Sequence, residues 1–325
     1  MEWQSPKERK ICRGDYMKTT ELLLTPTSVD DILPLIEAGA DAFVVGEQRY
    51  GLRLAGEFSR EDIAKATKLA HEHGKKVYVA MNAIFHNDLV PELEDYIAFV
   101  RDTGADAIIF GDPAVLMVAR EVAPNMKLHW NTETTATNWF TCNYWGKKGA
   151  KRAVLAREIS LDAILEMTEH AEVELEVQVH GMTCMFQSRR TLIGNYFEYQ
   201  GKNLAVENRR ENKNMFLHDE ERGNKYPIFE DHNGTHIMSP NDICMIDELQ
   251  DMLEAGVSSF KIDGILKDQQ YLVTVTKLYR QAIDTFMEDA AKYDDIKSNL
   301  LEQIEAIQPE NRPLDTGFFF KETVY

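Results

Sequence analysis

Residues 174–184 read E-L-E-V-Q-V-H-G-M-T-C, and this stretch decides the fold prediction. Apolar and polar residues alternate over its first half, which is the period of two expected for a β-strand. The strand ends at His180 and Gly181, and the thiol of Cys184 follows in the next loop. In barrels and doubly wound α/β proteins, sites are built where the parallel strands end. His180 and Cys184 are therefore the first candidate site residues.

The same kind of strand occurs seven more times, in units of about 30 residues that include a helical pattern. Four of the predicted helices are followed by glycines that can end them, at Gly39, Gly74, Gly104 and Gly149. This even rhythm predicts a (β/α)8, TIM-barrel-like α/β fold, and an open doubly wound sheet is the alternative. The eight predicted strands cover residues 21–26, 41–46, 75–82, 107–112, 127–132, 152–158, 174–180 and 258–264.

The unit after the seventh strand is abnormally long. About sixty residues separate His180 from Ser239-Pro240, where the next helix is predicted to begin. Loops of this length are usually functional or disordered, and the aromatic residues favour a folded insertion over the barrel mouth. The alternative is a solvent-exposed loop that takes no part in catalysis or binding. The predicted organisation is a leader at 1–20, a barrel at 21–290 with an insertion at about 182–240, and a tail at 291–325.

Composition excludes several classes of protein. The chain has 325 residues, four widely spaced cysteines and a formal net charge of −18. No apolar run reaches the roughly 18 residues of a membrane span, and the polar first residues do not resemble a secretory signal. We therefore expect a reduced, cytoplasmic protein without a membrane partner. Binding of nucleic acid would need a local basic patch or the charge of a partner.

Polar residues end the predicted strands, and a barrel would bring them to one face. Arg157 and Glu158 end an apolar strand and must be solvated, paired or functional, with a structural ion pair as the alternative. Lys261 lies inside the eighth strand and either binds an anion in the barrel or points outward. We expect His180, Arg157, Glu158, Asn131 and Lys261 to face one cavity under the insertion. The residues predicted to bind substrate are Asn82, Asn131, Thr132, Lys261 and Asp263.

Several common motifs of catalysis are missing from the sequence. It contains no H-E-x-x-H zinc motif, no P-loop, no G-x-G-x-x-G after a strand and no G-x-S-x-G elbow. His180 and Cys184 could form a thiolate–imidazole pair, but their spacing of four residues on a loop is only suggestive. A buried, inert cysteine is the alternative for Cys184.

Motifs along most of the chain resemble one family. They are L-L-T-P at 23–26, A-G-A-D-A at 38–42, K-V-Y-V-A-M-N at 76–82, D-P at 112–113, L-A-R-E at 155–158, E-V-Q-V-H-G-M-T-C at 176–184, N-D-I-C at 241–244 and E-A-G-V-S-S-F-K-I-D-G at 254–264. Together they are similar to the collagenase-like peptidase family U-32. This resemblance implies a TIM-barrel-like core and a cytoplasmic bacterial protein.

The resemblance also implies two kinds of activity. A few members of the family carry the peptidase label. Others resemble oxygen-independent hydroxylation factors for the tRNA wobble uridine, ribosomal RNA or a ubiquinone precursor, and they use a [4Fe–4S] cluster on four cysteines. The tRNA branch resembles enzymes that draw the hydroxyl group from prephenate.

The cluster pattern of the family is incomplete in this chain. Cys184 matches the first cluster cysteine and Cys244 the last, but Thr191 stands at the second and no cysteine lies between 184 and 244. Ile265 replaces an arginine of the family pattern. A cluster needs about four thiolate ligands, so Cys184 and Cys244 would hold one only with ligands from a partner or from other residue types.

Two classes of function follow from these observations. The first is a subunit that forms 5-hydroxyuridine at the tRNA wobble position, binding RNA or prephenate jointly with a four-cysteine homologue. The acidic net charge fits a subunit that relies on its partner for phosphate contacts. The second is a peptidase, with His180 and Cys184 as the nucleophilic pair or with Glu158 and His180 holding a metal. A non-catalytic scaffold is a third possibility.

Overall fold

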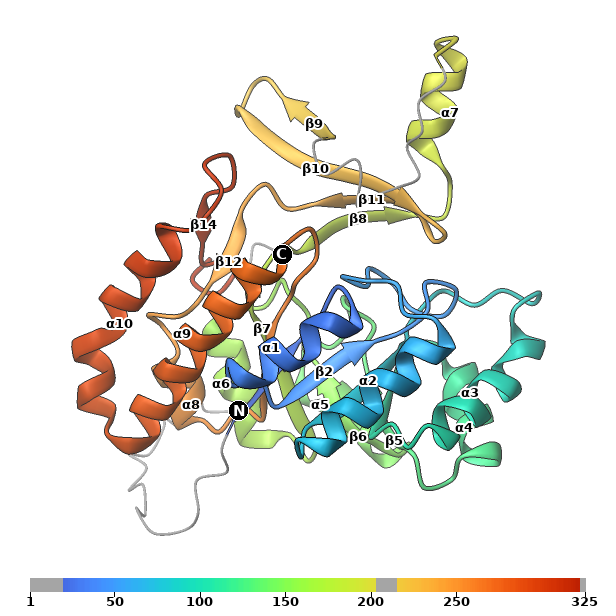
Figure 1. Cartoon of the computed structure of the whole chain (residues 1–325), viewed down its shortest axis with the longest axis horizontal. Coiled ribbons are helices and arrows are strands. Elements are labelled where there is room, and N and C mark those ends of the chain that lie inside the picture. Colours follow the sequence, from blue (N-terminus) through green and yellow to red (C-terminus); the bar gives the residue numbers. More distant parts are fainter. Residues whose placement is uncertain (1–19, 203–214, 322–325) are drawn as a thin grey trace, which may run out of the picture.

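The computed structural model describes residues 20–202 and 215–321, and these form a closed barrel with an insertion (Figure 1). In the described ranges, eight parallel strands follow one another around the barrel, and β13 closes it by pairing with both β1 and β7. The predicted (β/α)8, TIM-barrel-like fold is therefore confirmed. The barrel strands are β1 (Glu21–Leu24), β2 (Ala42–Val45), β3 (Lys76–Met81), β4 (Ala107–Phe110), β5 (Lys127–Trp130), β6 (Ala150–Val154), β7 (Glu174–Gly181) and β13 (Ser259–Ile262).

Helices surround the barrel, and side chains at their first residues determine where several of them begin. Ser59 and Asp62 form a capping box at the start of α2, and the side chain of Ser160 accepts a hydrogen bond at the start of α6. Asp112 caps α4 directly after β4, with proline at the first helical position. The surrounding helices are α1 (Ile32–Glu37), α2 (Arg60–Glu72), α3 (Leu93–Asp102), α4 (Pro113–Val122), α5 (Trp139–Lys147), α6 (Leu161–His170), α8 (Gln250–Glu254) and α9 (Gln269–Glu288), with short 3-10 turns at Val29–Asp31 and Val90–Glu92.

The core contains a buried layer of charge near the amino ends of the barrel strands. Arg152 on β6 donates to Glu21 on β1 at 2.6 Å and to Glu176 on β7 at 3.3 Å. Glu174 accepts a third contact from Arg152 at 2.9 Å, and the hydroxyl of Tyr78 donates to Glu21 at 2.7 Å. Buried charges are tolerated when they are paired and hydrogen-bonded in this way. We call Arg152, Glu21, Glu174 and Glu176 the basal cluster.

The insertion follows β7 and forms an antiparallel sheet beyond the carboxyl ends of the barrel strands (Figure 1). The amide of Asn233, in a tight turn of this sheet, donates to the backbone oxygens of Gln48 and Gly51, which fixes the insertion to the β2–α2 loop. The insertion therefore covers the barrel end at which sites are built. Its elements are β8 (Cys184–Ser188), α7 (Leu192–Tyr199), β9 (Phe216–Asp219), β10 (Asn224–Asp231) and β11 (Gly234–Met238).

The prediction of a helix that begins near Pro240 is wrong. A short strand, β12 (Asp242–Cys244), lies there instead, antiparallel to β7 and parallel to β14 (Leu314–Asp315). The side chain of Asp242 is buried against Lys267 and Arg312, which are far away in sequence. These long-range ion pairs outweigh the preference of Ser239-Pro240 for a helix start. They cannot be predicted from a short window of sequence.

The C-terminal segment, predicted as a tail at 291–325, packs onto the barrel over its described part. It forms α10 (Ala290–Glu305), which lies along α9, and then β14 (Figure 1). Nineteen of the twenty residues of the predicted leader lie outside the described residues. None of the helices in residues 20–202 and 215–321 is long and apolar enough to cross a membrane.

Candidate functional site

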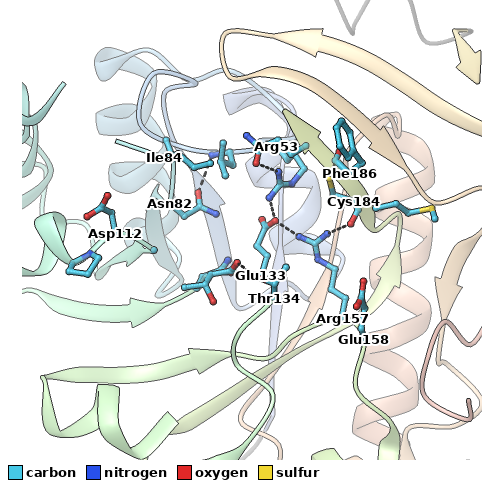
Figure 2. A pocket seen from close by; sticks show the side chains of 18 residues that line it. Arg53, Asn82, Ile84, Asp112, Glu133, Thr134, Arg157, Glu158, Cys184 and Phe186 are labelled. Carbon is cyan, nitrogen blue, oxygen red and sulfur yellow. Dashed lines mark hydrogen bonds and ion pairs between the residues drawn. The ribbon is translucent and has the colours of Figure 1, made fainter. Parts of the chain in front are cut away.

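A cavity of about 510 Å3 lies between the carboxyl ends of the barrel strands and strand β8 of the insertion (Figure 2). Loops that follow β2, β3, β4, β5 and β6 form its floor and sides. Met185 and Phe186 of β8 line it from the insertion, and Ile84 adds a further apolar side chain. The sequence-predicted residues that line it are Asn82, Asn131, Thr132, Arg157, Glu158 and Cys184.

Two arginines share one carboxylate at the centre of this cavity (Figure 2). Nη2 of Arg157 lies 2.6 Å from Oε2 of Glu133, and Nη2 of Arg53 contacts the same oxygen. Arg157 also donates from Nη1 to the backbone oxygen of Cys184 at 3.3 Å, which joins the barrel to the insertion. We call Arg53, Glu133 and Arg157 the arginine trio. Its formal charges sum to +1, so it retains attraction for an anion.

The backbone that carries the trio is strained. Arg53 and Glu133 have φ of 49° and 65°, in the left-handed region that non-glycine residues seldom adopt. The side chain of Asn131 accepts a hydrogen bond from the Glu133 backbone at 3.0 Å and so holds this turn. Strain of this kind costs of the order of 1–3 kcal/mol per residue and is concentrated at functional sites. The strained positions here are those that place the two charges.

Arg53 is deeply buried and incompletely paired. Burial, and then the neighbouring charge of Arg157, lower the pKa of Arg53 to about 10, so it stays charged at neutral pH. Its Nη1 donates to Gln187 at 3.3 Å, while its Nε has no hydrogen-bond partner within the described part of the chain. A buried, unpaired donor on a charged group is costly, and an anionic ligand would satisfy it.

Cys184 faces the cavity with a perturbed thiol. Burial alone would raise its pKa, but the neighbouring imidazole of His236 and the charges of Arg53 and Arg157 outweigh burial and hold the pKa below its ordinary value. The thiol donates to the backbone oxygen of Phe186 at 3.2 Å. The alternative of a buried and inert cysteine does not fit this position, since Cys184 is partly exposed and beside two cations.

The predictions that His180 faces the cavity and pairs with Cys184 are wrong. His180 is fully buried and does not line the cavity. Its Nε2 lies 2.8 Å from the hydroxyl of Tyr271, and its Nδ1 lies 3.4 Å from that of Tyr279, both on α9. Burial lowers the pKa of His180 to about 3, so the ring is neutral. His180 therefore anchors α9 to the end of β7.

Lys261 and Asp263 lie deeper, beneath the cavity. They line a narrow pocket of about 40 Å3 that also contacts Arg157 and Asn131. Nζ of Lys261 is 3.0 Å from Oδ2 of Asp263, so the lysine faces the barrel interior as a paired charge. Of the two orientations open to Lys261, the inward one is found.

The other predicted residues take smaller roles around the cavity. The amide oxygen of Asn82 accepts from the backbone of Leu52 at 3.0 Å, which shapes the loop before Arg53. Glu158 is exposed at the edge of the cavity. Both Arg157 and Glu158 follow β6 rather than end it, because the strand is shorter than predicted. Arg157 forms an ion pair with Glu133, so the alternative of an ion pair is found for Arg157.

The cysteines in the described ranges do not fit a four-thiolate cluster. Cys142 is buried on α5, Cys244 is buried 3.8 Å from the hydroxyl of Tyr279, and burial raises the pKa of each to about 11. Cys184 alone of the three lines the cavity. Residues 20–202 and 215–321 contain no group of three or more potential metal ligands. The predicted Glu158–His180 metal site is not formed either, because Glu158 lies at the edge of the cavity and His180 is buried against two tyrosines. Cys12 lies outside the described residues.

Two residues at this site, Arg53 and His236, are missed by sequence reasoning. Glu133 directly follows the fifth predicted strand, so the rule that sites lie at strand ends places it on the same face as Asn131 and Thr132 without giving it a role. Arg53 lies in the long loop after β2, and its contact with Glu133 depends on the unusual backbone at both residues. His236 lies in the insertion, where no motif or period marks it.

Comparison with solved structures bears on the fold. A crystal structure of dihydrodipicolinate synthase matches with a TM-score of 0.50 and 12% identity, covering 90% of this chain and 85% of that one. At this level of identity the likeness concerns the barrel alone.

Comparison with known sequences identifies the family. The chain is 67% identical over 309 residues to tRNA hydroxylation protein P2 of Bacillus subtilis (strain 168), covering 95% of this chain and all of that protein. It is 32% identical over 303 residues to tRNA hydroxylation protein P1 of the same strain, covering 93% of this chain and 71% of that one. The model of peptidase family U32 matches residues 27–324. The chain belongs to peptidase family U32.

Proposed function

We propose that this chain is one subunit of a pair that hydroxylates tRNA in the cytoplasm, forming 5-hydroxyuridine at the wobble position. The observation that carries this proposal is 67% identity over the full length of tRNA hydroxylation protein P2. The same organism has a protein P1, which is also a relative of this chain. Two related proteins with the same named activity in one organism support a pair of subunits.

The cavity suits prephenate, a small dicarboxylate, as the hydroxyl donor. Arginine is well adapted to carboxylates because its guanidinium can donate two parallel hydrogen bonds. The trio offers net positive charge and the unpaired Nε of Arg53. Apolar side chains at Ile84, Met185 and Phe186 would contact the ring of the donor. Asn82, Asn131 and Thr132 would complete the polar lining.

The partner would supply what this chain lacks. A homologous subunit with four cysteines would hold the [4Fe–4S] cluster, since the described cysteines of this chain do not converge on one site. The net charge of −18 implies that most phosphate contacts to tRNA also come from the partner. Exposed basic residues on the insertion, Arg189, Arg190 and Lys202, would add local contacts.

The partner experiment measures iron and acid-labile sulfide on protein purified without oxygen. We expect none on this chain alone, and a full cluster in a stable complex after co-expression with a four-cysteine homologue of the same genome. Iron bound by this chain alone would contradict the division of roles between the subunits.

The activity experiment measures 5-hydroxyuridine by mass spectrometry of tRNA from a deletion strain that expresses variants. Arg157→Gln should abolish the modification, because it removes from the cavity one guanidinium that can donate hydrogen bonds to a carboxylate. Arg101→Gln, a change of the same type on the exposed end of α3, is the matched control and should restore it. Normal modification with Arg157→Gln would overturn the role of the trio. Hydrolysis of a peptide by the purified chain, blocked by thiol reagents and without a tRNA defect, would favour the peptidase alternative instead.

A further inference from the structure

Cys184 lies beside a buried histidine of the insertion, His236, which is hydrogen-bonded to an aspartate. Strand β8 begins at Cys184 and pairs with β11. Cys184 pairs with Met238, and the register of the two strands shifts between Ile237 and Met238. His236 of β11 is fully buried, and its Nε2 lies 2.9 Å from Oδ1 of Asp231 on β10. The insertion sheet thus places a carboxylate, an imidazole and a thiol in sequence, with the thiol at the cavity.

The hydrogen bonds of His236 are incomplete while the thiol is neutral. Nε2 is taken by Asp231, and Nδ1 has no hydrogen-bond partner in residues 20–202 and 215–321. The Cys184 proton is directed at the backbone oxygen of Phe186 instead. A buried ring nitrogen without a partner is costly. Moving the thiol proton to Nδ1 removes that cost, because the imidazolium then donates to Asp231 on one side and to the thiolate on the other.

The cavity side of Cys184 stabilises the same charge state. Arg157 donates to the backbone oxygen of Cys184, and the charges of Arg53 and Arg157 favour an anionic sulfur. The lowered pKa of the thiol agrees with this geometry. The two arginines also attract anions into the 510 Å3 cavity that Cys184 lines. A neutral electrophile gains nothing from them.

We propose that Cys184 is a nucleophile with His236 as its base and Asp231 as the positioning residue, and that it takes small electrophiles that carry a carboxylate. In the reaction, the thiol proton passes to Nδ1 of His236, a bond forms between Sγ and the electrophilic carbon, and the displaced electron pair departs with the leaving group. With iodoacetate, the carbon–iodine bond breaks and iodide leaves. This chemistry is independent of tRNA hydroxylation, so either proposal can fail without the other.

The test measures alkylation of each cysteine in the reduced full-length protein at pH 7, using iodoacetate and iodoacetamide, by mass spectrometry of the cysteine peptides. We expect Cys184 to react at least about 10-fold faster than glutathione, with Cys142 and Cys244 as slow, buried internal references. The ratio of iodoacetate to iodoacetamide rates should exceed that of glutathione about 10-fold, since the arginines attract the carboxylate. Rates and ratios equal to those of glutathione would overturn the proposal.

Variants separate the base from the surrounding structure. His236→Gln retains an amide that can donate to Asp231 but lacks a base at Nδ1, and it should slow alkylation of Cys184 at least about 10-fold. His180→Gln removes the histidine that is bonded to Tyr271 and Tyr279, and it should leave the rate unchanged. Equal rates for His236→Gln and the wild type would refute the assignment of the base.

Spectroscopy gives a readout that folding defects do not mimic. Thiolate absorbance near 240 nm should be present in the wild type at pH 7 and absent in Cys184→Ser. Asp231→Asn should lower this absorbance while the far-ultraviolet circular dichroism is retained, because the imidazolium loses its carboxylate partner. If His236→Gln does not fold, the wild-type absorbance and alkylation ratio still decide. No thiolate signal in the folded wild type would count against the proposal.

Discussion

The two ends of the barrel use arginine in opposite ways. In the basal cluster, Arg152 faces three carboxylates, and its contacts at 2.6–3.3 Å satisfy the guanidinium, while Lys76 adds a further contact to Glu21 at 3.3 Å. In the arginine trio, two cations share one carboxylate, and a donor of Arg53 lacks a partner in the described part of the chain. The basal cluster is built on regular strands, while Arg53 and Glu133 of the trio have strained backbones.

This difference separates structural charge from charge held for a ligand. A charge cluster that is fully paired within the protein has no free donor for a ligand, so removing one of its charges lowers the stability of the fold. A cluster with excess charge and a strained backbone costs stability, so removing one of its charges weakens ligand binding more than folding. The comparison can be tested by removing charges from each end.

The largest effect on stability is expected from Arg152→Met. This change leaves Glu176 buried without its ion-pair partner and Glu21 with Lys76 alone, and breaking a buried ion pair on one side costs about 3–5 kcal/mol. Urea unfolding should show that loss in the free energy of unfolding. Arg101→Met, on the exposed end of α3, is the matched control and should change it by less than about 0.5 kcal/mol. A loss below about 1 kcal/mol for Arg152→Met would contradict a structural role for the basal cluster.

The second effect concerns acid stability. Burial opposes ionisation of Glu21, but the charge and hydrogen bond of Arg152 outweigh it and lower the pKa from 4.5 to about 2. The folded pKa lies below the unfolded one, so this contribution is present above pH 4.5 and is lost as pH falls towards 2. The shift corresponds to about 3 kcal/mol. The raised pKa of Glu176, caused by burial, acts in the opposite direction, but its contribution changes above pH 4.5 and so lies outside the pH range in which the contribution of Glu21 is lost.

Glu21→Gln tests this acid dependence. The difference in unfolding free energy between the wild type and Glu21→Gln should shrink as pH falls from about 4.5 to 2, measured by urea unfolding at each pH. Glu310→Gln, an exposed carboxylate, is the control and should follow the wild type. A difference that stays constant over this range would show that Glu21 does not carry the effect.

The sequence predicts the fold better than the site, for physical reasons. Strands and helices follow from local alternation, capping and glycine positions, so the barrel was predictable. The contact of Arg53 with Glu133 requires two residues at positive φ, which no local pattern marks. His180 looked functional because it ends a strand beside a thiol, yet two tyrosines of α9 bury it. The distant partners of Asp242 likewise explain the wrong helix near Pro240.

A smaller effect is expected where strain is held in the trio. Asn131→Ala removes the hydrogen bond to the backbone of Glu133 and should cost about 1 kcal/mol of unfolding free energy. Asn195→Ala, on α7 of the insertion and exposed, is a matched control that should be nearly neutral. If Asn131→Ala is also neutral, the strained turn at Glu133 is held by its ion pairs alone.

The smallest effect on stability, and the sharpest contrast with Arg152, is expected for Arg157→Gln. The change leaves Arg53 and Glu133 as a one-to-one pair, and the new amide can still donate towards Glu133, so unfolding free energy should change by less than about 1 kcal/mol. Ligand binding should respond strongly. Prephenate should raise the thermal midpoint of the wild type, because a ligand stabilises the state that binds it, and it should not raise that of Arg157→Gln. A loss above about 2 kcal/mol without ligand would place the trio with the basal cluster, as structural charge.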